Sequence, residues 1–348
     1  MSTRKPIQIR RIPIISVEKQ KQVKILKPAK EVALGTDNLN RQAFLKMTPK
    51  AMDSMLTQKK AAKVVETETQ KINGEYKEVE AITKFWFEVV EGCDLTKIVD
   101  LTPTDQWVLG ACMAEIQKGN GDTTANIIYR DCGGSGNPSP QKIEEILQSV
   151  DKMIGLKVRI DATDTKNKLK QLSREYSEDF KEIVVGTVLP AYYQYTVMNG
   201  VPNTITITFY DISPLFKYAL AKGQVTTIPS ELLNVPKRKN TPHFQQLKGY
   251  INIRIQSIKR TRKHNKQFPA IITMEDMIKN CGFQATLDDK HFRKRLWEDI
   301  TLYMEFLIDK GTITGFKCLT KDGKEMKKWQ DNGKIFFTYP ADSIIQIK

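Results

Sequence analysis

Residues 288–300, DDKHFRKRLWEDI, form the stretch on which our interpretation of this chain depends. Asp288 or Asp289 is suited to cap a helix, and apolar residues recur at helical spacing as far as Leu307. The first turns of that helix carry five basic residues: Lys290, His291, Arg293, Lys294 and Arg295. Cations at a helix N-terminus oppose the helix dipole, so folding stability does not favour this arrangement. A helix that reads DNA does need it, because its N-terminal residues enter the major groove; the alternative is a basic patch on an exposed helix end.

The segments around this helix predict a small unit of three helices and a β-hairpin. The expected elements are a helix over 244–258, a strand at 271–272, a helix capped by Thr273, the helix from Lys290, and a hairpin over 312–339. Helix, helix, helix and hairpin is the order of a winged helix, which we expect over residues 224–348. Lys327 and Lys328, in the hairpin loop, are expected to reach phosphates beside the site that the helix reads.

The stretch between Leu232 and Met274 contains no Asp or Glu and carries ten basic residues. A solvated helix surface normally mixes both signs, because opposite charges three or four residues apart stabilise the helix. We therefore favour phosphate contact over solubility as the reason for this composition. Eight of the ten are candidate DNA contacts: Lys237, Arg238, Lys239, Lys259, Arg260, Arg262, Lys263 and Lys266. The other two are Lys248 and Arg254, and we expect Lys248 to lie off the apolar face of its helix.

A similar order of elements is expected between residues 101 and 223. Thr102 and Ser139, each followed by Pro, start helices, with a short helix from Thr123 or Thr124 between them. Strands are expected at 156–160, 183–189, 192–198 and 204–209. This order predicts a first winged helix, and because its strands are long we expect its wing to be large. Gln141 and Lys142, at the start of its third helix, are further candidate DNA contacts.

The first hundred residues have a different character. Residues 1–45 are expected to form a flexible basic arm, and an unstructured solubilising tail is the alternative. Residues 46–100 are expected to contain a short helix from Pro49 and a hairpin that turns at Asn73 and Gly74. The predicted fold class is therefore α+β, with two tandem winged helices preceded by the arm and the hairpin.

The composition favours a polyanionic partner inside the cell. The chain has 55 Lys and Arg against 40 Asp and Glu, a formal net charge of +15, and Lys and Arg release condensed counterions when they meet phosphates. Its five cysteines are widely spaced without a C-x-x-C pair, which indicates reduced thiols rather than a zinc site or a disulfide framework. The sequence has neither an apolar run of membrane-spanning length nor a secretory signal. We therefore expect a cytoplasmic protein without a membrane contact.

No residue of the sequence is a candidate for catalysis. His243, His264 and His291 stand alone, which disfavours the metal-dependent nucleases of rolling-circle initiation. No P-loop motif is present, and the glycine-rich residues 132–136 lack the strand-then-helix context of a phosphate loop. We interpret that stretch as a flexible link, and we predict no enzyme activity, no metal site and no cofactor.

Four segments combine apolar and basic positions in a pattern that we compare with known families. They are residues 205–218 (ITITFYDISPLFKY), 247–255 (LKGYINIRI), 272–278 (ITMEDMI) and 292–300 (FRKRLWEDI). In these segments, and in element order from residue 101 to 348, the chain resembles the iteron-binding plasmid replication initiators. The resemblance implies two tandem winged helices that bind direct repeats of double-stranded DNA at an origin, help to open the duplex and recruit host replication proteins. It also implies that the first domain serves dimerisation and that residues 292–300 belong to the recognition helix.

Three functions from different classes stay open at this point. The first is a replication initiator of a plasmid or related mobile element, and the second is a winged-helix transcriptional regulator that binds promoter DNA. The third is an RNA-binding or structural protein that grips phosphates without reading sequence. Two basic modules suit long repeated sites, so we place initiation first. RNA binders commonly display surface aromatics for stacking, whereas the aromatic residues here fall mainly on core-facing positions.

Overall fold

The computed structural model describes residues 32–36, 39–46, 55, 60–72, 74–93, 100–169, 182–198, 201–236 and 240–340. These residues form a mixed α+β fold in which all strand pairings are antiparallel. The predicted helix from Pro49, most of the basic arm and the cations Lys237, Arg238 and Lys239 lie outside the described residues.

The C-terminal unit has the predicted order of elements. It consists of α8 (Pro242–His264), β10 (Ile271–Thr273), α9 (Met274–Cys281), η3 (Gln284–Thr286), α10 (Lys290–Asp309), β11 (Gly315–Leu319) and β12 (Lys334–Thr338). The hairpin strand β12 lies in the middle of a three-stranded sheet of order β10-β12-β11. Local sequence fixes the helix ends, since Thr241, Thr273 and Asp289 each accept a hydrogen bond from the first turn of the helix that they cap.

The same order of elements occurs in the N-terminal half. It consists of α3 (Pro103–Lys118), β4 (Asp122–Thr123), α4 (Ala125–Asp131), α5 (Pro140–Ile154), β7 (Ala191–Met198) and β8 (Val201–Phe209). Its sheet has the order β4-β8-β7, so the strand that enters after the first helix again pairs with the second strand of the hairpin. The two units are therefore topological repeats. Thr102 and Asp105 form a full capping box at the start of α3.

An insertion distinguishes the first unit from the second. Between α5 and β7 the chain adds β5 (Leu156–Asp161), α6 (Thr163–Leu169) and β6 (Ile183–Thr187). These strands pair with the expected N-terminal hairpin, β2 (Ala62–Ile72) and β3 (Glu75–Val89), in a four-stranded sheet of order β2-β3-β5-β6. The prediction that the strands from residue 156 onward enlarge the wing is therefore wrong for β5 and β6. Phe85 and Phe87 on β3, facing Ile160 and Val158 on β5, bury this sheet against the first core.

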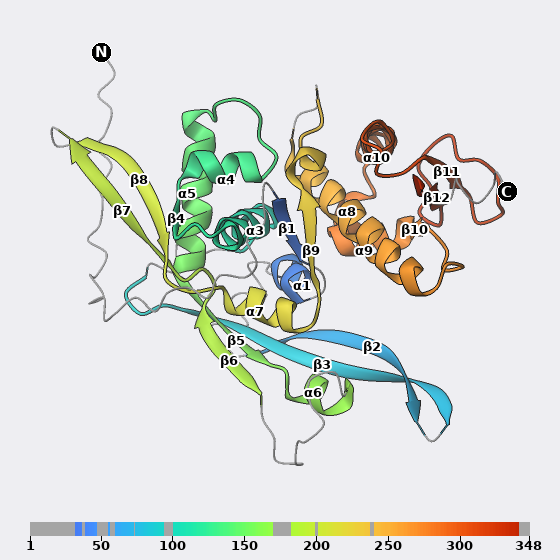
Figure 1. Ribbon diagram of the computed structural model, residues 1–348, viewed down its shortest axis with the longest axis horizontal. Coiled ribbons are helices and arrows are strands. Elements are labelled where there is room, and N and C mark those ends of the chain that lie inside the picture. Colours follow the sequence, from blue (N-terminus) through green and yellow to red (C-terminus); the bar gives the residue numbers. More distant parts are fainter. Residues whose placement is uncertain are drawn as a thin grey trace.

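The expected arm is shorter than residue 45. Val32–Thr36 form β1, which pairs with β9 (Val225–Pro229), and Leu39–Lys46 form α1. Leu39, Ala43 and Phe44 are fully buried, so α1 is amphipathic and part of the core. Figure 1 shows the β1–β9 pair between the two units, with the four-stranded sheet along the bottom of the view. The helix α7 (Pro214–Ala221) and the turn η2 (Ser230–Leu233) complete the connection to α8.

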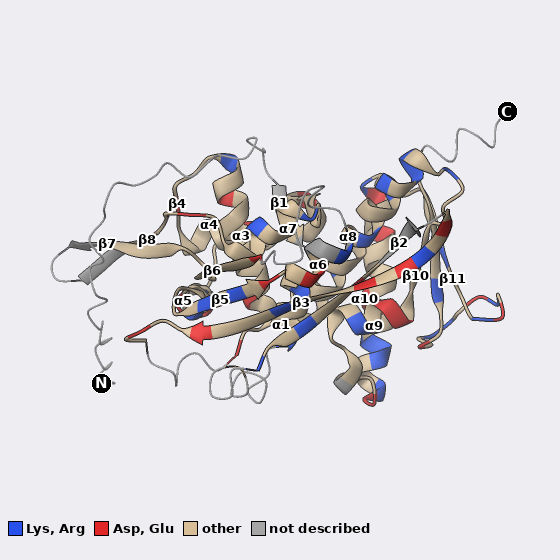
Figure 2. Cartoon of the chain, turned by 90° about the horizontal axis from the view of Figure 1, so that it is seen from below, with Lys and Arg blue, Asp and Glu red and all other residues tan. Residues whose placement is uncertain are grey.

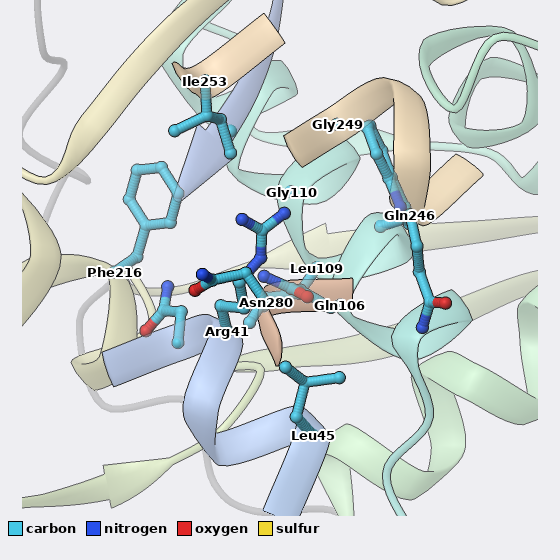
Figure 3. A pocket seen from close by; sticks show the side chains of 13 residues that line it. Arg41, Leu45, Gln106, Leu109, Gly110, Phe216, Gln246, Gly249, Ile253 and Asn280 are labelled. Carbon is cyan, nitrogen blue, oxygen red and sulfur yellow. The ribbon is translucent and has the colours of Figure 1, made fainter. Parts of the chain in front are cut away.

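The two units meet where α3 lies against α8. Trp107 on α3 packs against the apolar cores of both units. Gly249 on α8 permits this approach, since a Cβ atom there would lie 2.5 Å from Cζ2 of Trp107. Arg41 of α1 enters a pocket beside this contact, and Figure 3 shows its side chain between Phe216 and Gln246. Its guanidinium lies 5.2 Å from the centre of the Tyr250 ring, a cation–π distance.

Replacing Gly249 by Ala tests whether this contact joins the two units. Alanine raises helix propensity by about 1 kcal/mol, whereas a methyl group forced against a packed indole costs about 1–3 kcal/mol. We therefore expect Gly249→Ala to lower the free energy of unfolding, measured by denaturant titration. A Trp107→Phe background should relieve the clash, so the two substitutions should be coupled in a double-mutant cycle. Two results together would contradict this account: a Gly249→Ala variant more stable than the wild type by the full gain in helix propensity, and no coupling energy between Gly249→Ala and Trp107→Phe.

Candidate nucleic-acid interface

The start of α10 carries the recognition patch, which we define as Lys290, His291, Arg293, Lys294 and Arg295. All five side chains are exposed except that of Arg293, which is half-buried. Asp289 holds the helix start, since its Oδ1 accepts the backbone N–H of His291 at 2.7 Å. The opposite side of α10 is anchored by Leu296, Ile300 and Leu307, which are buried in the second core. The apolar stripe thus directs the cations outward, as the sequence pattern predicts.

The cations of the recognition patch are not used to hold the fold. Among the residues that the structure describes, no ion pair involves any of the five. Lysines elsewhere behave differently: Lys118, Lys152 and Lys222 each pair with a buried or nearly buried carboxylate. An exposed cluster of like charge without carboxylate partners is an electrostatic footprint suited to a polyanion.

An aromatic cluster supports the start of α10 from behind. The ring of His243, at the first turn of α8, lies 5.1 Å from that of Phe292 on α10 and 5.9 Å from that of Phe283, each an edge or tilted contact. Burial lowers the pKa of His243, and the neighbouring Arg295 lowers it further. The imidazole is therefore neutral at pH 7. Sequence reasoning left His243 without a role, because its partners come from segments forty residues or more away.

The β11–β12 hairpin of the second unit carries a further group of exposed lysines. Lys327 and Lys328, predicted from the sequence, are both exposed in the β11–β12 connection. They lie between Met326 and Trp329, which are buried and hold the loop to the core. Four exposed lysines on the same hairpin were not selected by the sequence argument: Lys317, Lys321, Lys324 and Lys334. Figure 2 shows blue segments on the part of the molecule that carries α8, α10 and β11.

The cations at the end of α8 form a separate group. The start of α8 touches the start of α10 through His243, but Lys259 follows sixteen residues later, a rise of about 24 Å along the helix. The structure therefore does not bring Lys259, Lys263 and Lys266 to the recognition patch. We call these three exposed residues the α8-end patch.

Three other cations of the acid-free stretch make contacts within the fold. Arg260 donates through Nη2 to Oγ1 of Thr226 on β9. Arg262 donates through Nη1 to the carbonyl of Phe268 at 2.8 Å, and its guanidinium lies 5.8 Å from the ring centre of Tyr339. Lys248 is 2% exposed, so the expectation that it lies on the outer face of its helix is wrong. Leu233 and Asn240, from the segment that precedes α8, contact its ammonium, and helical periodicity does not report such contacts.

The corresponding helix of the first unit is less basic. Gln141 and Lys142 are exposed at the start of α5, where the sequence placed them as candidates. The Lys142 ammonium pairs with the carboxylate of Glu145, and exposed Glu144 lies beside it. The charge of Lys142 is therefore partly neutralised within its own helix, unlike the charges at the start of α10.

The described residues hold no group of three or more His, Cys, Asp or Glu side chains arranged to bind a metal ion. All five cysteines are unpaired thiols, and burial raises the pKa of Cys132 and Cys281 to about 12, so these two are neutral and unreactive. In the glycine-rich stretch, residues 132–134 are packed rather than a loose link, since a Cβ on Gly134 would lie 2.4 Å from the Tyr129 ring, whereas residues 135 and 136 are exposed. Within the described part of the chain, no helix has the length and apolar character needed to cross a bilayer.

The arrangement of Arg295 beside His243 can be tested through the imidazole. Replacing Arg295 by Met should raise the pKa of His243 toward its ordinary value, because a nearby positive charge disfavours protonation. The rise should be partial, since burial is the larger cause and remains. Proton NMR of the imidazole measures it. Lys294→Met removes the same charge one residue away; an equal shift in both variants would show a general field effect and contradict the placement.

Comparisons with known proteins find weakly similar solved structures and no matching family. No protein-family model matches the chain, and no curated protein matches it in sequence. Among solved structures, it is similar to a selenomethionine derivative of domains 2 and 3 of RctB, with a TM-score of 0.39 and 11% identity over 84% of this chain and 98% of that chain. A second structure of RctB domains 2–3, residues 155–483, gives a TM-score of 0.38 and 11% identity over 83% of this chain and 96% of that one.

Proposed function

We propose that this chain binds double-stranded DNA through two tandem winged helices and initiates replication of a plasmid or related mobile element. The observation that carries the proposal is the recognition patch, an unpaired group of cations at the start of α10. This helix is the third of its unit, the position of the helix that enters the major groove in winged-helix and helix-turn-helix proteins. Its cations would contact base edges and phosphates there.

The repeated topology supports a long DNA site. In both units the hairpin lies beside the third helix: β11 contacts α10, and the Tyr193 hydroxyl of β7 donates to the Leu147 carbonyl of α5 at 2.9 Å. Two such modules joined rigidly would contact neighbouring segments of one duplex. The unequal charge of α5 and α10 supports a division of labour, in which α10 reads sequence and α5 contributes weaker contacts. A second copy of the chain and host replication proteins are further proposed partners, which follow from the family resemblance alone. The proposal assigns no catalytic step and no cofactor to the chain.

Replacing Arg293, Lys294 and Arg295 by Ala tests the recognition patch. Each lost base contact costs about 1–3 kcal/mol, so affinity for the specific duplex should fall by at least about a hundredfold. Affinity for unrelated duplex should fall much less, which lowers the specificity ratio. Fluorescence anisotropy at several salt concentrations measures both quantities, and circular dichroism checks that the fold is intact.

Two matched variants distinguish sequence-specific recognition by α10 from the general attraction of cations to DNA phosphates. Lys259→Ala, Lys263→Ala and Lys266→Ala together remove three exposed cations from the α8-end patch and should preserve the specificity ratio. Lys327→Ala with Lys328→Ala should also preserve it, while the slope of log affinity against log salt falls by about 0.9 for each lost phosphate contact. If the α8-end variant lost specificity and the recognition-patch variant kept it, the assignment to α10 would be wrong.

The choice between initiation and promoter regulation is tested on DNA. An initiator with two groove-reading modules should protect tandem direct repeats, each about two helical turns long, from cleavage by hydroxyl radicals. A plasmid that carries these repeats and the gene should replicate in a host that lacks other initiators. Protection of a single promoter site, with no replication, would favour the regulator and overturn the initiator.

A further inference from the structure

A pocket of about 610 Å³ lies where the first unit meets the segment that leads into α8. One wall is the end of α4 and the turn after it, with Tyr129 and residues 133–135. The other wall is residues 233–236 together with Asn240. Figure 1 shows the α4–α5 connection reaching toward the start of α8. Lys248, from the second turn of α8, also lines the pocket.

The Lys248 ammonium is buried with uncharged partners. Its Nζ donates to the backbone carbonyl of Leu233 and, at 2.8 Å, to Oδ1 of Asn240. Within the described residues no carboxylate pairs with it, and none lines the pocket. A buried charge is costly unless an opposite charge compensates it. Burial accordingly lowers the pKa of Lys248 to about 7.

The pocket is built by specific contacts between the two units. The Asn240 amide donates from Nδ2 to the carbonyl of Cys132 at 3.2 Å while its Oδ1 accepts from Lys248, so it ties the turn to the lysine. Gly133 has a left-handed φ of 82°, and a Cβ there would lie 2.7 Å from the carbonyl oxygen of Leu233. The turn and the linker therefore fit together only with glycine at this position. The glycine-rich stretch that sequence reasoning set aside shapes one wall.

We propose that this pocket binds a phosphate group, with the ammonium of Lys248 as its charge partner. Two of the three N–H donors of the ammonium are used by Leu233 and Asn240. Its Nζ also lies 4.9 Å from the centre of the Phe244 ring, a weaker cation–π contact that an incoming anionic oxygen would replace or supplement. None of the residues that line the pocket is an acid, so no carboxylate of the lining repels an anion. The anion would supply the compensation that the neutral partners do not.

The phosphate has two possible sources. One is the backbone of bound DNA, in which case the inference rests on the proposed function. A phosphate held there would fix the turn before α5 against α8, and so set the first unit relative to the second on the duplex. The other source is a free phosphate or nucleotide, which would act as a ligand between the units. The chemistry at Lys248 is the same in both.

Inorganic phosphate tests the site without DNA. The full chain is titrated with phosphate against chloride at constant ionic strength, and the pKa of Lys248 is followed by NMR of its ¹³Cε. Phosphate should raise this pKa and raise the melting temperature. Lys248→Met should abolish the thermal response, and Lys248→Arg, which keeps a charge, should retain it. Lys157→Met, which removes an exposed lysine of β5, should respond as the wild type does.

Several outcomes would overturn the proposal. They are an unchanged Lys248 pKa in phosphate, or a Lys248→Met variant that responds as fully as the wild type. If both lysine variants fail to fold, the wild-type pKa measurement decides alone. Phosphate ethylation interference then identifies the source. If ethylation of one DNA phosphate weakens binding by the wild type but not by Lys248→Met, the pocket binds the DNA backbone. If no phosphate behaves in this way, the pocket binds a free phosphate. Failure of specific DNA binding leaves the phosphate titration unaffected, so the two proposals fail separately.

Discussion

The close approach of α3 to α8 is the constraint on which the rest of the structure depends. Trp107 belongs to both apolar cores, and only the missing side chain of Gly249 lets the two helices come near enough for that. Because packed interiors transmit small displacements rather than absorb them, this contact fixes one unit relative to the other. The N-terminal pieces β1 and α1 then close the junction, with β1 paired to β9 and Arg41 seated against Tyr250.

The two units share a topology and differ in what they present to solvent. In the first, the insertion of β5, α6 and β6 supplies half of a sheet that the N-terminal hairpin completes. Asp164 of α6 bonds to the edge of β3 just past the last residue that pairs with β5, since its Oδ2 accepts the backbone N–H of Ile82 at 2.7 Å. In the second, the described residues hold no such insertion, and exposed basic side chains lie at the start of α10, on the β11–β12 hairpin and in the α8-end patch. The same architecture thus carries an additional sheet in the first unit and more exposed cations in the second.

The candidate interface could be predicted where its signal is local. The cations of 290–295 follow directly from an apolar stripe that determines which face of α10 is outward, and the structure has them exposed apart from half-buried Arg293. The acid-free stretch was less informative, because composition does not say where along a 23-residue helix each charge points. It yielded one exposed patch far from the start of α10, two arginines with hydrogen bonds within the fold, and one buried lysine. His243, which supports α10, carried no sequence signal at all.

What the sequence by itself determined is the order of the helices and the hairpin within each of the two units, but not β1 and α1, which lie in the predicted arm. Caps such as Thr102, Ser139 and Asp289 act within a single turn, and apolar periodicity acts within a single element, so both are visible in a short window of residues. Only the tertiary structure decided which strands share a sheet, how α3 meets α8, and that Lys248 ends in a pocket between the units. Those outcomes depend on partners brought together from distant segments, β5 with β3 and Asn240 with Cys132, and on whether a glycine leaves room for them. No local pattern encodes such contacts, because the free energy that selects them comes from burial shared between segments.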